Sequence, residues 1–302
     1  MNPARLRAYL MLLVVAVIWG IATPIIKYTL EGFSPVIFLT YRFGISTVIA
    51  IVIFAVTRDH FSKNWKLLVL ILIHAFLNSV VSLGLLFFGM ENTTVLETSL
   101  ITLTMPLIIS TAGVYFLHEH ITKRERVGMG IAILGTLLTI IEPLINNGHN
   151  MIKLSGNILV FGYVISSVVT TIIAKKILKD GANPMTMSNI SFILGFIFFL
   201  PFALKTEGFT VSSLMAVPLS YHLGVIYMAV LSGTLAFYLG NRAQKTIEIG
   251  EQSLFSYLYP IFALPLAVFW LGEKVTPTFI VGGIIITIGV VIAEIKKKRY
   301  NT

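Results

Sequence analysis

Two stretches, ETSLITLTMP at residues 97–106 and EQSLFSYLYP at residues 251–260, each place a glutamate and a proline nine residues apart inside an apolar run. They begin 154 residues apart in the chain. The residues that recur at this offset include the pairs Glu97/Glu251, Pro106/Pro260, Gly128/Gly282 and Gly135/Gly289. Apolar segments match easily by chance, whereas glutamates, prolines and glycines at one fixed offset do not. The chain is therefore predicted to hold two related units, 1–148 and 149–302.

A weaker set of matches lies earlier in each unit, at an offset of 149 residues. It consists of the pairs Lys27/Lys176, Gly32/Gly181 and Pro35/Pro184. The smaller offset fits a longer loop near 205–219 in the second unit.

Composition indicates a lipid environment. Of the 302 residues 56% are hydrophobic and only 12% are charged, against about 25% charged in a soluble domain. The chain has no cysteine, which excludes disulfides and cysteine-ligated metals. The net charge of +9 comes from basic residues between apolar runs, which indicates membrane topology. We expect membrane lipids and a small-molecule substrate as partners and no nucleic acid; a monomer is one option for the oligomeric state.

A spanning helix needs about 20 predominantly apolar residues. Ten candidate spans follow along the sequence: 8–30, 35–56, 67–89, 95–117, 127–145, 155–175, 184–204, 220–241, 250–271 and 277–295. With the N-terminus in the cytoplasm, the inside segments hold 17 of the 22 Lys and Arg residues and the outside segments hold 4, with Arg42 inside a span. This positive-inside bias predicts that both termini are cytoplasmic.

Each unit holds five spans. Because five is odd, the second unit must enter the membrane from the opposite side. The predicted fold is an all-α membrane protein, with ten transmembrane helices arranged as a 5+5 inverted repeat around a central cavity. Such repeats are typical of secondary transporters, whose substrate site lies near the midplane between the repeats.

The segments WGIATPIIK (19–27), LHEHITKRERVGMGIAILGTLL (117–138) and LGEKVTPTFIVGGIIITIGVV (271–291) resemble the drug/metabolite transporter superfamily, in particular its EamA-like ten-helix exporters. The resemblance covers nearly the whole chain and both repeats. It implies efflux of small metabolites, often amino acids, across the prokaryotic inner (plasma) membrane. The sequence departs from the pattern at His118, where the second unit has Gly272, and we interpret this as a loop variation.

Pro106 and Pro260 are predicted to kink spans 4 and 9, because proline lacks an N–H and clashes with the carbonyl four residues back. The freed carbonyls belong to Thr102 and Ser256. Two compatible interpretations are a packing kink with hydroxyl groups bonding back to the backbone, and a direct part in the transport pathway.

Glu97 and Glu251 open the same two spans. A carboxylate in the first turn is stabilised by the positive end of the helix dipole. The functional alternative is coupling, in which the carboxylate binds a proton or a substrate amine.

Arg42 lies within an apolar run, where a charge costs about 2.5–3.5 kcal/mol at a helix centre. It either snorkels to the outer interface or faces the cavity and binds a substrate carboxylate. His74, Asn78 and Ser82 follow one another at helical spacing on one face. They form either a cavity wall or a set of interhelical hydrogen bonds.

Further hydroxyl and aromatic side chains mark spans 1, 4, 6, 8 and 9, where small hydroxyls also serve packing. The full set predicted to bind substrate is Trp19, Thr23, Arg42, His74, Asn78, Ser82, Thr102, Tyr163, Ser167, Tyr238, Ser256 and Tyr257.

Enzyme motifs are missing from the sequence. It holds no nucleotide-binding glycine loop, no paired histidines at metal spacing and no serine elbow, so we expect no catalytic residue, metal or cofactor. Transport would be driven by the substrate gradient, by exchange or by protons. The alternatives are a membrane-embedded enzyme acting on lipids, which would need a cluster of His, Asp or Glu, and a broad-specificity exporter of drugs or nucleotide precursors.

Overall fold

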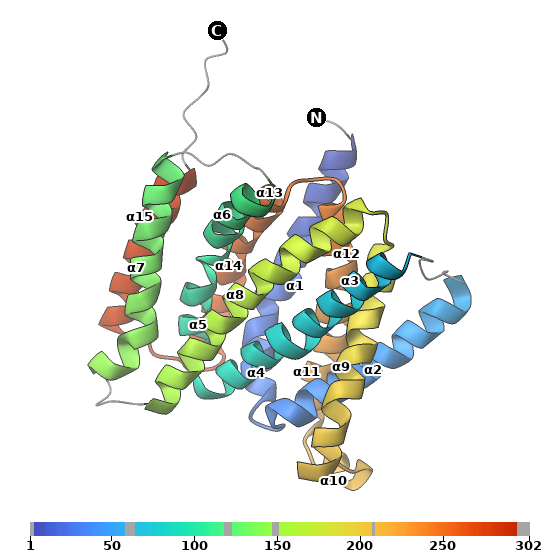
Figure 1. Cartoon of the computed structure of the whole chain (residues 1–302). Coiled ribbons are helices and arrows are strands. Elements are labelled where there is room, and N and C mark those ends of the chain that lie inside the picture. Colours follow the sequence, from blue (N-terminus) through green and yellow to red (C-terminus); the bar gives the residue numbers. More distant parts are fainter. Residues whose placement is uncertain (1–2, 58–63, 118–122, 147–150, 207–208, 295–302) are drawn as a thin grey trace.

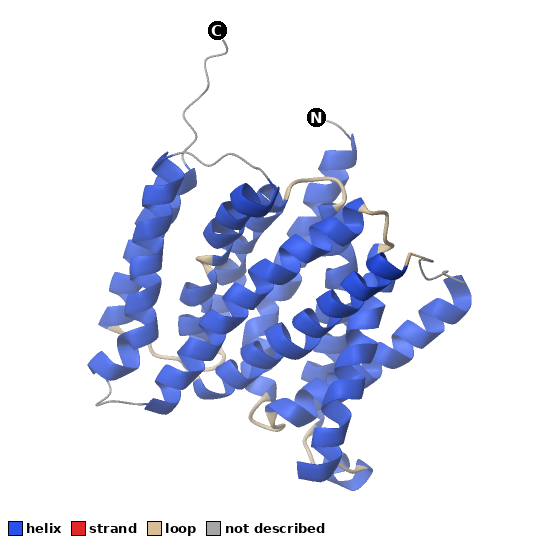
Figure 2. Ribbon diagram, in the orientation of Figure 1, coloured by secondary structure: helices blue, strands red, loops and turns tan. Residues whose placement is uncertain are grey.

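A computed structural model describes residues 3–57, 64–117, 123–146, 151–206 and 209–294. Within these ranges every regular element is a helix (Figure 2), which confirms the predicted all-α class. The beginning of α1 and the end of α15 lie at the same end of the bundle (Figure 1).

The elements fall into two series of similar order. The first consists of α1 (Pro3–Thr29), α2 (Pro35–Thr57), α3 (Trp65–Ala75), η1 (Phe76–Ser82), α4 (Leu83–Asn92), α5 (Val95–Thr102), α6 (Met105–Leu117) and α7 (Lys123–Asn146). The second consists of α8 (Met151–Lys179), α9 (Pro184–Thr206), α10 (Val211–Met215), α11 (Leu219–Ala229), η2 (Val230–Leu235), α12 (Ala236–Gln244), α13 (Ile249–Ser253), η3 (Leu254–Leu258), α14 (Tyr259–Phe269) and α15 (Pro277–Glu294). The short α10 occupies the longer loop expected near 205–219.

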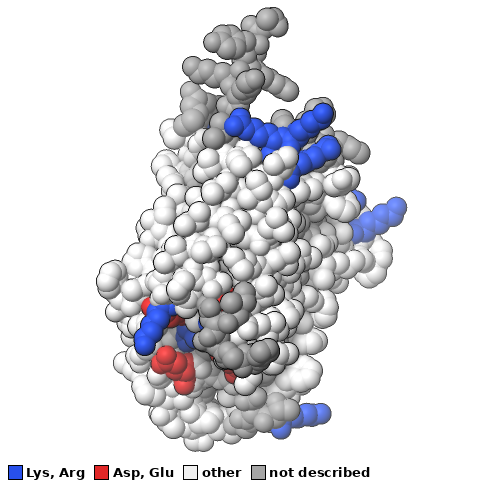
Figure 3. Space-filling model, turned by 90° about the vertical axis from the view of Figure 1, so that its left-hand side faces the viewer, with Lys and Arg blue, Asp and Glu red and all other residues white. Residues whose placement is uncertain are grey.

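Membrane-spanning character is clear from length and composition. Eight helical segments of the described chain are long and apolar enough to cross a membrane, and two shorter apolar segments run over Leu254–Phe269 and Pro277–Ala293. The face formed by α7 and α15 carries charged side chains toward its two ends, while its middle is free of the coloured charged atoms (Figure 3). That pattern suits a lipid-exposed surface.

Local signals set several helix ends. Pro35 and Pro184 begin α2 and α9, where a missing N–H costs little. The Thr94 side chain accepts the Glu97 N–H at 3.1 Å and caps α5. Gly272, three residues after α14 ends, has a φ of 66°, a left-handed conformation that favours glycine.

In four of the predicted spans the regular α-helical hydrogen bonding is interrupted. The predicted spans 67–89 and 220–241 each contain a π-helical turn, η1 and η2, and these turns start 154 residues apart, at Phe76 and Val230. The predicted span 95–117 divides between α5 and α6, and a 3₁₀ segment, η3, lies inside 250–271. The restarted helices α6 and α14 also begin 154 residues apart, at Met105 and Tyr259.

The prolines lie at these interruptions. Pro106 and Pro260 are the second residues of α6 and α14, where the first turn needs no N–H from proline. The predicted kinks in continuous helices are therefore replaced by breaks at which a new helix begins. The Thr102 hydroxyl donates to the Thr98 carbonyl at 2.9 Å, and the Ser256 hydroxyl donates to the Ser253 carbonyl. The hydroxyl back-bonding that the sequence suggested is thus present at both breaks.

Helices α7 and α15 pack side by side (Figure 1) through glycines. A Cβ added to Gly128 would stand 2.4 Å from the Gly289 carbonyl oxygen, and one added to Gly135 would stand 3.0 Å from the Gly282 carbonyl oxygen. As residue numbers rise along α7 they fall along α15, so the two helices are antiparallel.

Other contacts join the two series. Helix α2 packs against α9, α4 against α8, and α1 against α11, α12 and α14. The first helix is thus surrounded largely by elements of the second series, and the space between the two series holds the cavity described next.

Candidate functional site

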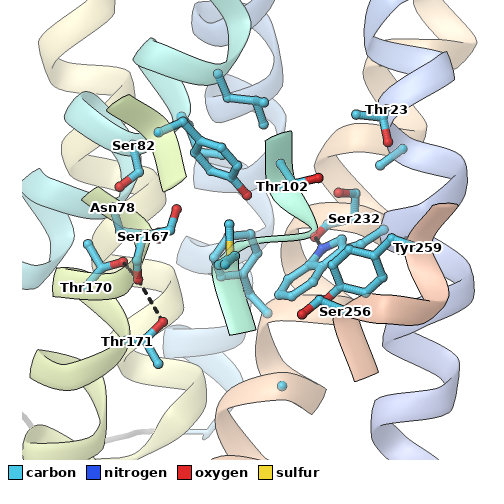
Figure 4. A pocket seen from close by; sticks show the side chains of 18 of the residues that line it. Thr23, Asn78, Ser82, Thr102, Ser167, Thr170, Thr171, Ser232, Ser256 and Tyr259 are labelled. Carbon is cyan, nitrogen blue, oxygen red and sulfur yellow. Dashed lines mark hydrogen bonds between the residues drawn. The ribbon is translucent and has the colours of Figure 1, made fainter. Parts of the chain in front are cut away.

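A cavity of about 200 Å³ lies between the two series of helices. The sequence-predicted residues that line it are Trp19, Thr23, Arg42, His74, Asn78, Ser82, Thr102, Tyr163, Ser167 and Ser256. Figure 4 shows Asn78, Ser82 and Ser167 on one side and Thr102, Ser256 and Tyr259 on the other. The structure brings these side chains together, and their binding of a substrate stays a prediction.

The lining comes from matching positions in the two units. Along α1 and α8 the lining residues correspond at an offset of 148, in the pairs Trp19/Ser167, Ala22/Thr170, Thr23/Thr171 and Ile26/Ala174. Around the two helix breaks they correspond at an offset of 154, in the pairs Thr98/Gln252, Thr102/Ser256 and Met105/Tyr259. Each series of helices therefore contributes lining residues from the same parts of its fold.

Two predicted tyrosines lie outside the lining. Tyr238 is not among the lining residues, and its hydroxyl instead accepts a hydrogen bond from Arg242 Nη1 at 2.6 Å. The lining face of α12 carries Phe237, Gly240 and Asn241, because the π turn before this helix changes which residues face inward.

Tyr257 is likewise absent from the lining, and Tyr259 is present. Residues three apart eclipse one another in a 3₁₀ helix. Tyr259 follows directly after η3 as the first residue of α14, three residues beyond Ser256, and both line the cavity.

Trp19 is held among aromatic rings at one side of the cavity. Its indole N–H donates to the Ser232 carbonyl at 3.0 Å. Its ring meets Phe237 and Tyr259 edge to face, with centroids 5.3 Å and 6.1 Å away. Edge-to-face packing of this kind stabilises ring orientation, so this wall presents a fixed apolar surface.

The opposite wall is polar. The Ser82 and Ser166 hydroxyls are hydrogen bonded at 2.7 Å. Buried His74 Nδ1 and Asn78 Nδ2 have no hydrogen-bond partner within the described part of the chain. Most buried polar atoms are paired, so these lining atoms are available to a bound solute.

Two further lining atoms share this property. Thr98 Oγ1 and Gln252 Oε1 are buried without a hydrogen-bond partner among the described residues. They come from equivalent positions at the beginning of the two broken spans.

Arg42 faces the cavity rather than the outer interface. It is 1% exposed, and its guanidinium carbon lies 5.6 Å and 5.5 Å from the ring centroids of Phe43 and Phe87. Its Nε and Nη1 have no hydrogen-bond partner in the described structure. Contact with two aromatic rings compensates a buried cation only in part.

Glu97 lies outside the lining, at the start of α5. Its carboxylate forms an ion pair with Lys153 Nζ at 2.8 Å and accepts the Thr93 hydroxyl at 2.7 Å. The side chain is 2% exposed. Glu251 belongs to α13, but its side chain lies outside the described residues. Coupling through either glutamate stays a prediction.

Glu273 lies in the loop after α14 and has a role that its local sequence does not reveal. Its carboxylate accepts the Val95 N–H at 2.7 Å and the Leu96 N–H at 2.9 Å, so it caps α5 from the other half of the chain. Burial raises the pKa of the Glu273 carboxyl above its usual range, while the two N–H donors and the charge of Lys27 act in the opposite direction.

Two lysines hold the ends of equivalent helices. Lys27 Nζ donates to the Met90 carbonyl at 2.9 Å at the end of α4. Lys175 Nζ donates to the Gln244 carbonyl at 2.5 Å at the end of α12. Met90 and Gln244 are 154 residues apart. The structural counterpart of Lys27 is therefore Lys175, which corrects the predicted pairing with Lys176.

Within the described residues no group of three or more His, Cys, Asp or Glu side chains could hold a metal ion. A bundle of apolar helices around a partly polar cavity is the architecture of a multi-pass membrane transporter. The model of the EamA-like transporter family matches residues 6–141 and again residues 154–294. The chain belongs to this family, which confirms the resemblance to the drug/metabolite transporter superfamily.

The chain is also similar to transporter proteins of bacteria and, in its fold, to a solved structure. The uncharacterized transporter YetK of Bacillus subtilis is 26% identical over 297 residues, covering 98% of this chain and 89% of that protein. A probable amino-acid metabolite efflux pump of Salmonella typhimurium is 27% identical over 297 residues, covering 96% and 95%. A solved crystal structure with 14% identity matches 98% of this chain with a TM-score of 0.67, a likeness that concerns the fold alone.

Proposed function

We propose that this chain is a secondary transporter that exports small metabolites such as amino acids by alternating access, with the central cavity as the substrate site. The observation that carries the proposal is the cavity lined by matching positions of the two units. The probable amino-acid metabolite efflux pump of Salmonella typhimurium, similar over nearly its whole length, supports the substrate class.

Three observations support a 5+5 inverted repeat with units at 1–148 and 149–302. The family model matches the chain twice. The π turns and the restarted helices recur 154 residues apart. The glycine contacts between α7 and α15 are antiparallel, as required when the last span of each unit crosses the membrane in opposite directions. A site between two such units can be exposed to either side by rocking one against the other.

The basic residues support the orientation. With the proposed ten spans, 17 of the 22 Lys and Arg residues fall on the side of the N-terminus. Cytoplasmic termini in the inner membrane of a prokaryote follow from the positive-inside rule.

Transport in reconstituted vesicles tests the function. Vesicles loaded with unlabelled amino acid should accumulate external labelled amino acid by exchange, and vesicles without protein should not. Imposing a pH gradient distinguishes proton antiport, in which uptake responds to the gradient, from exchange that ignores it.

A matched pair of variants ties transport to the cavity. A Cβ added to Gly240 would lie 3.8 Å from Trp19 at the lining, whereas one added to Gly130 meets nothing within 4 Å. Gly240→Leu should fill the cavity and abolish exchange, while Gly130→Leu should leave exchange unchanged. Equal exchange by both variants would contradict the cavity as the substrate site.

A further inference from the structure

We propose that Arg42 anchors the carboxylate of the substrate, so that the cavity selects amphipathic solutes with a carboxylate at one end and an apolar or aromatic group at the other. This inference rests on the proposed function, because it names the substrate class of the same cavity.

The first step is that Arg42 is buried with N–H donors left unpaired among the described residues. Its side chain is 1% exposed, and Nε and Nη1 lack hydrogen-bond partners within the described chain. Buried Lys175 and half-buried Lys27 instead donate to backbone carbonyls. A buried charge without a partner is unfavourable, and a charged ligand that enters the cavity would remove that penalty.

The second step is the charge of the lining. Among the described residues that line the cavity, Arg42 is the one Lys or Arg, and no Asp or Glu is present. The ion pair of Glu97 with Lys153 lies outside this lining. In a low-dielectric enclosure one uncompensated positive charge attracts an anion and repels a cation. A solute with only an ammonium group would therefore be rejected.

The third step is the geometry of recognition. A guanidinium presents a planar fork of N–H donors that matches a carboxylate with two parallel hydrogen bonds. Asn78 Nδ2 is a further buried donor without a partner in the described structure. Gln252 Oε1 and Thr98 Oγ1 are buried acceptors that also lack a hydrogen-bond partner among the described residues. These acceptors would take the ammonium group of a zwitterionic amino acid once its carboxylate is held.

The fourth step is the apolar end. The rings of Trp19, Phe237 and Tyr259 pack edge to face along the lining. Met105 and Met228 add flexible apolar surface. A ring or branched aliphatic group fits this wall better than a second polar group does.

A ligand series on the purified wild-type protein tests the charge rule without any mutation. Phenylacetate, phenylalanine, phenylalaninamide, phenethylamine and phenyl phosphate share one ring and differ in their charged groups. We expect phenylacetate and phenylalanine to raise the melting temperature, since a ligand that binds the folded state stabilises it. We expect no shift with phenylalaninamide or phenethylamine. Equal shifts with acids and amines would overturn the inference, and a shift with phenyl phosphate alone would overturn the carboxylate assignment.

Variants then assign the effect to Arg42. Arg42→Gln should weaken phenylacetate binding at least about tenfold, because a charge-assisted bidentate contact is lost. Arg42→Lys should retain part of the affinity, because it keeps the charge but loses the fork. Arg242→Gln removes an exposed arginine that bonds Tyr238 outside the lining and should leave binding unchanged.

The melting temperature of Arg42→Gln without ligand shows whether a loss of binding reflects the site or a loss of folding. Arg42→Gln loses the contacts with Phe43 and Phe87 but also removes a buried cation whose Nε and Nη1 have no hydrogen-bond partner in the described structure. Without ligand the variant should therefore melt close to the wild-type temperature. Unchanged phenylacetate affinity in Arg42→Gln would overturn the inference, as would a fall in affinity matched by Arg242→Gln.

The proposed function fails in a different way. If wild-type vesicles exchange amines but not acids, the protein is a transporter and the role of Arg42 is refuted. If they exchange no amino acid while the ligand series and the Arg42 variants behave as expected, the anion site stands and the transport proposal falls.

Discussion

A Cβ placed on Gly128 would stand 2.4 Å from the carbonyl oxygen of Gly289, and a Cβ placed on Gly289 would stand 2.5 Å from the carbonyl oxygen of Gly128. The two helix backbones are therefore in direct contact at this point. Small residues at such contacts let membrane helices approach closely. This contact joins α7 to α15.

Replacing Gly128 by alanine should separate α7 from α15, because the obstructing atoms are backbone atoms of Gly289 and Ala293 and the Ala293 Cβ, none of which can rotate away. We expect a loss of about 1–3 kcal/mol in unfolding free energy, the usual cost of overpacking. Thermal unfolding in detergent measures it. Gly130→Ala, on the same helix but with open space around its Cβ, should be neutral or slightly stabilising. Equal melting temperatures for the two variants would contradict the contact.

Glu273→Gln should destabilise the start of α5, since a neutral amide offers one oxygen where the carboxylate now accepts the N–H groups of Val95 and Leu96. We expect a loss of about 1–3 kcal/mol, the range for hydrogen bonds to charged groups. Urea or thermal unfolding in detergent gives the value. Glu248→Gln is the control, because its exposed side chain makes no cap bond at α13. A difference below about 0.5 kcal/mol between the two variants would count against the cap.

Lys153→Met should leave the Glu97 carboxylate buried without its cation partner. Breaking a buried pair from one side costs about 3–5 kcal/mol, whereas removing both charges costs much less. The double variant Lys153→Met/Glu97→Gln should therefore be more stable than Lys153→Met alone. A double-mutant cycle by thermal unfolding measures this coupling. Strict additivity of the two single effects would show that the ion pair contributes nothing.

Lys27→Met and Lys175→Met should each loosen one helix end. The lost bonds are those to the Met90 carbonyl in the first case and the Gln244 carbonyl in the second. Amide hydrogen exchange should rise locally near the end of α4 or of α12, and only at the end whose lysine is changed. Lys176→Met alters an exposed neighbour and should change neither region. An equal rise at both ends in one variant would contradict separate local roles.

Much of this architecture is readable from sequence because two kinds of signal do not depend on packing. The apolar runs predict the apolar helices that the structure contains. The orientation predicted from lysine and arginine, and the repeat predicted from the fixed offset of Glu97 and Glu251, stay predictions. The stripe of His74, Asn78 and Ser82 lines the cavity as helical spacing predicts. The sequence left two placements open for Arg42, at the outer interface or in the cavity, and the structure places it in the cavity lining.

The lining positions on α12 and near η3, and the cap on α5, depend on hydrogen-bond patterns that single residues do not encode. Sequence periodicity assumes an uninterrupted α-helix, and the π turn η2 and the 3₁₀ segment η3 break that assumption. The structure places Tyr238 and Tyr257 outside the cavity lining and Tyr259 within it. Glu273 acts on residues of the other unit, a contact that local sequence cannot reveal.

The π turn η1 makes the cavity wall sensitive to chain length as well as to residue type. The Leu83 N–H bonds to the Asn78 carbonyl, five residues back rather than four. Deleting one residue within Phe76–Ser82 would restore ordinary winding and turn everything beyond it by about 100°. Leu86 and Phe87 would then leave the lining while His74 stayed in place. Insertions and deletions, commonly tolerated in loops, are thus disfavoured in the middle of this span, and also at η2, where the second unit has its own extra residue.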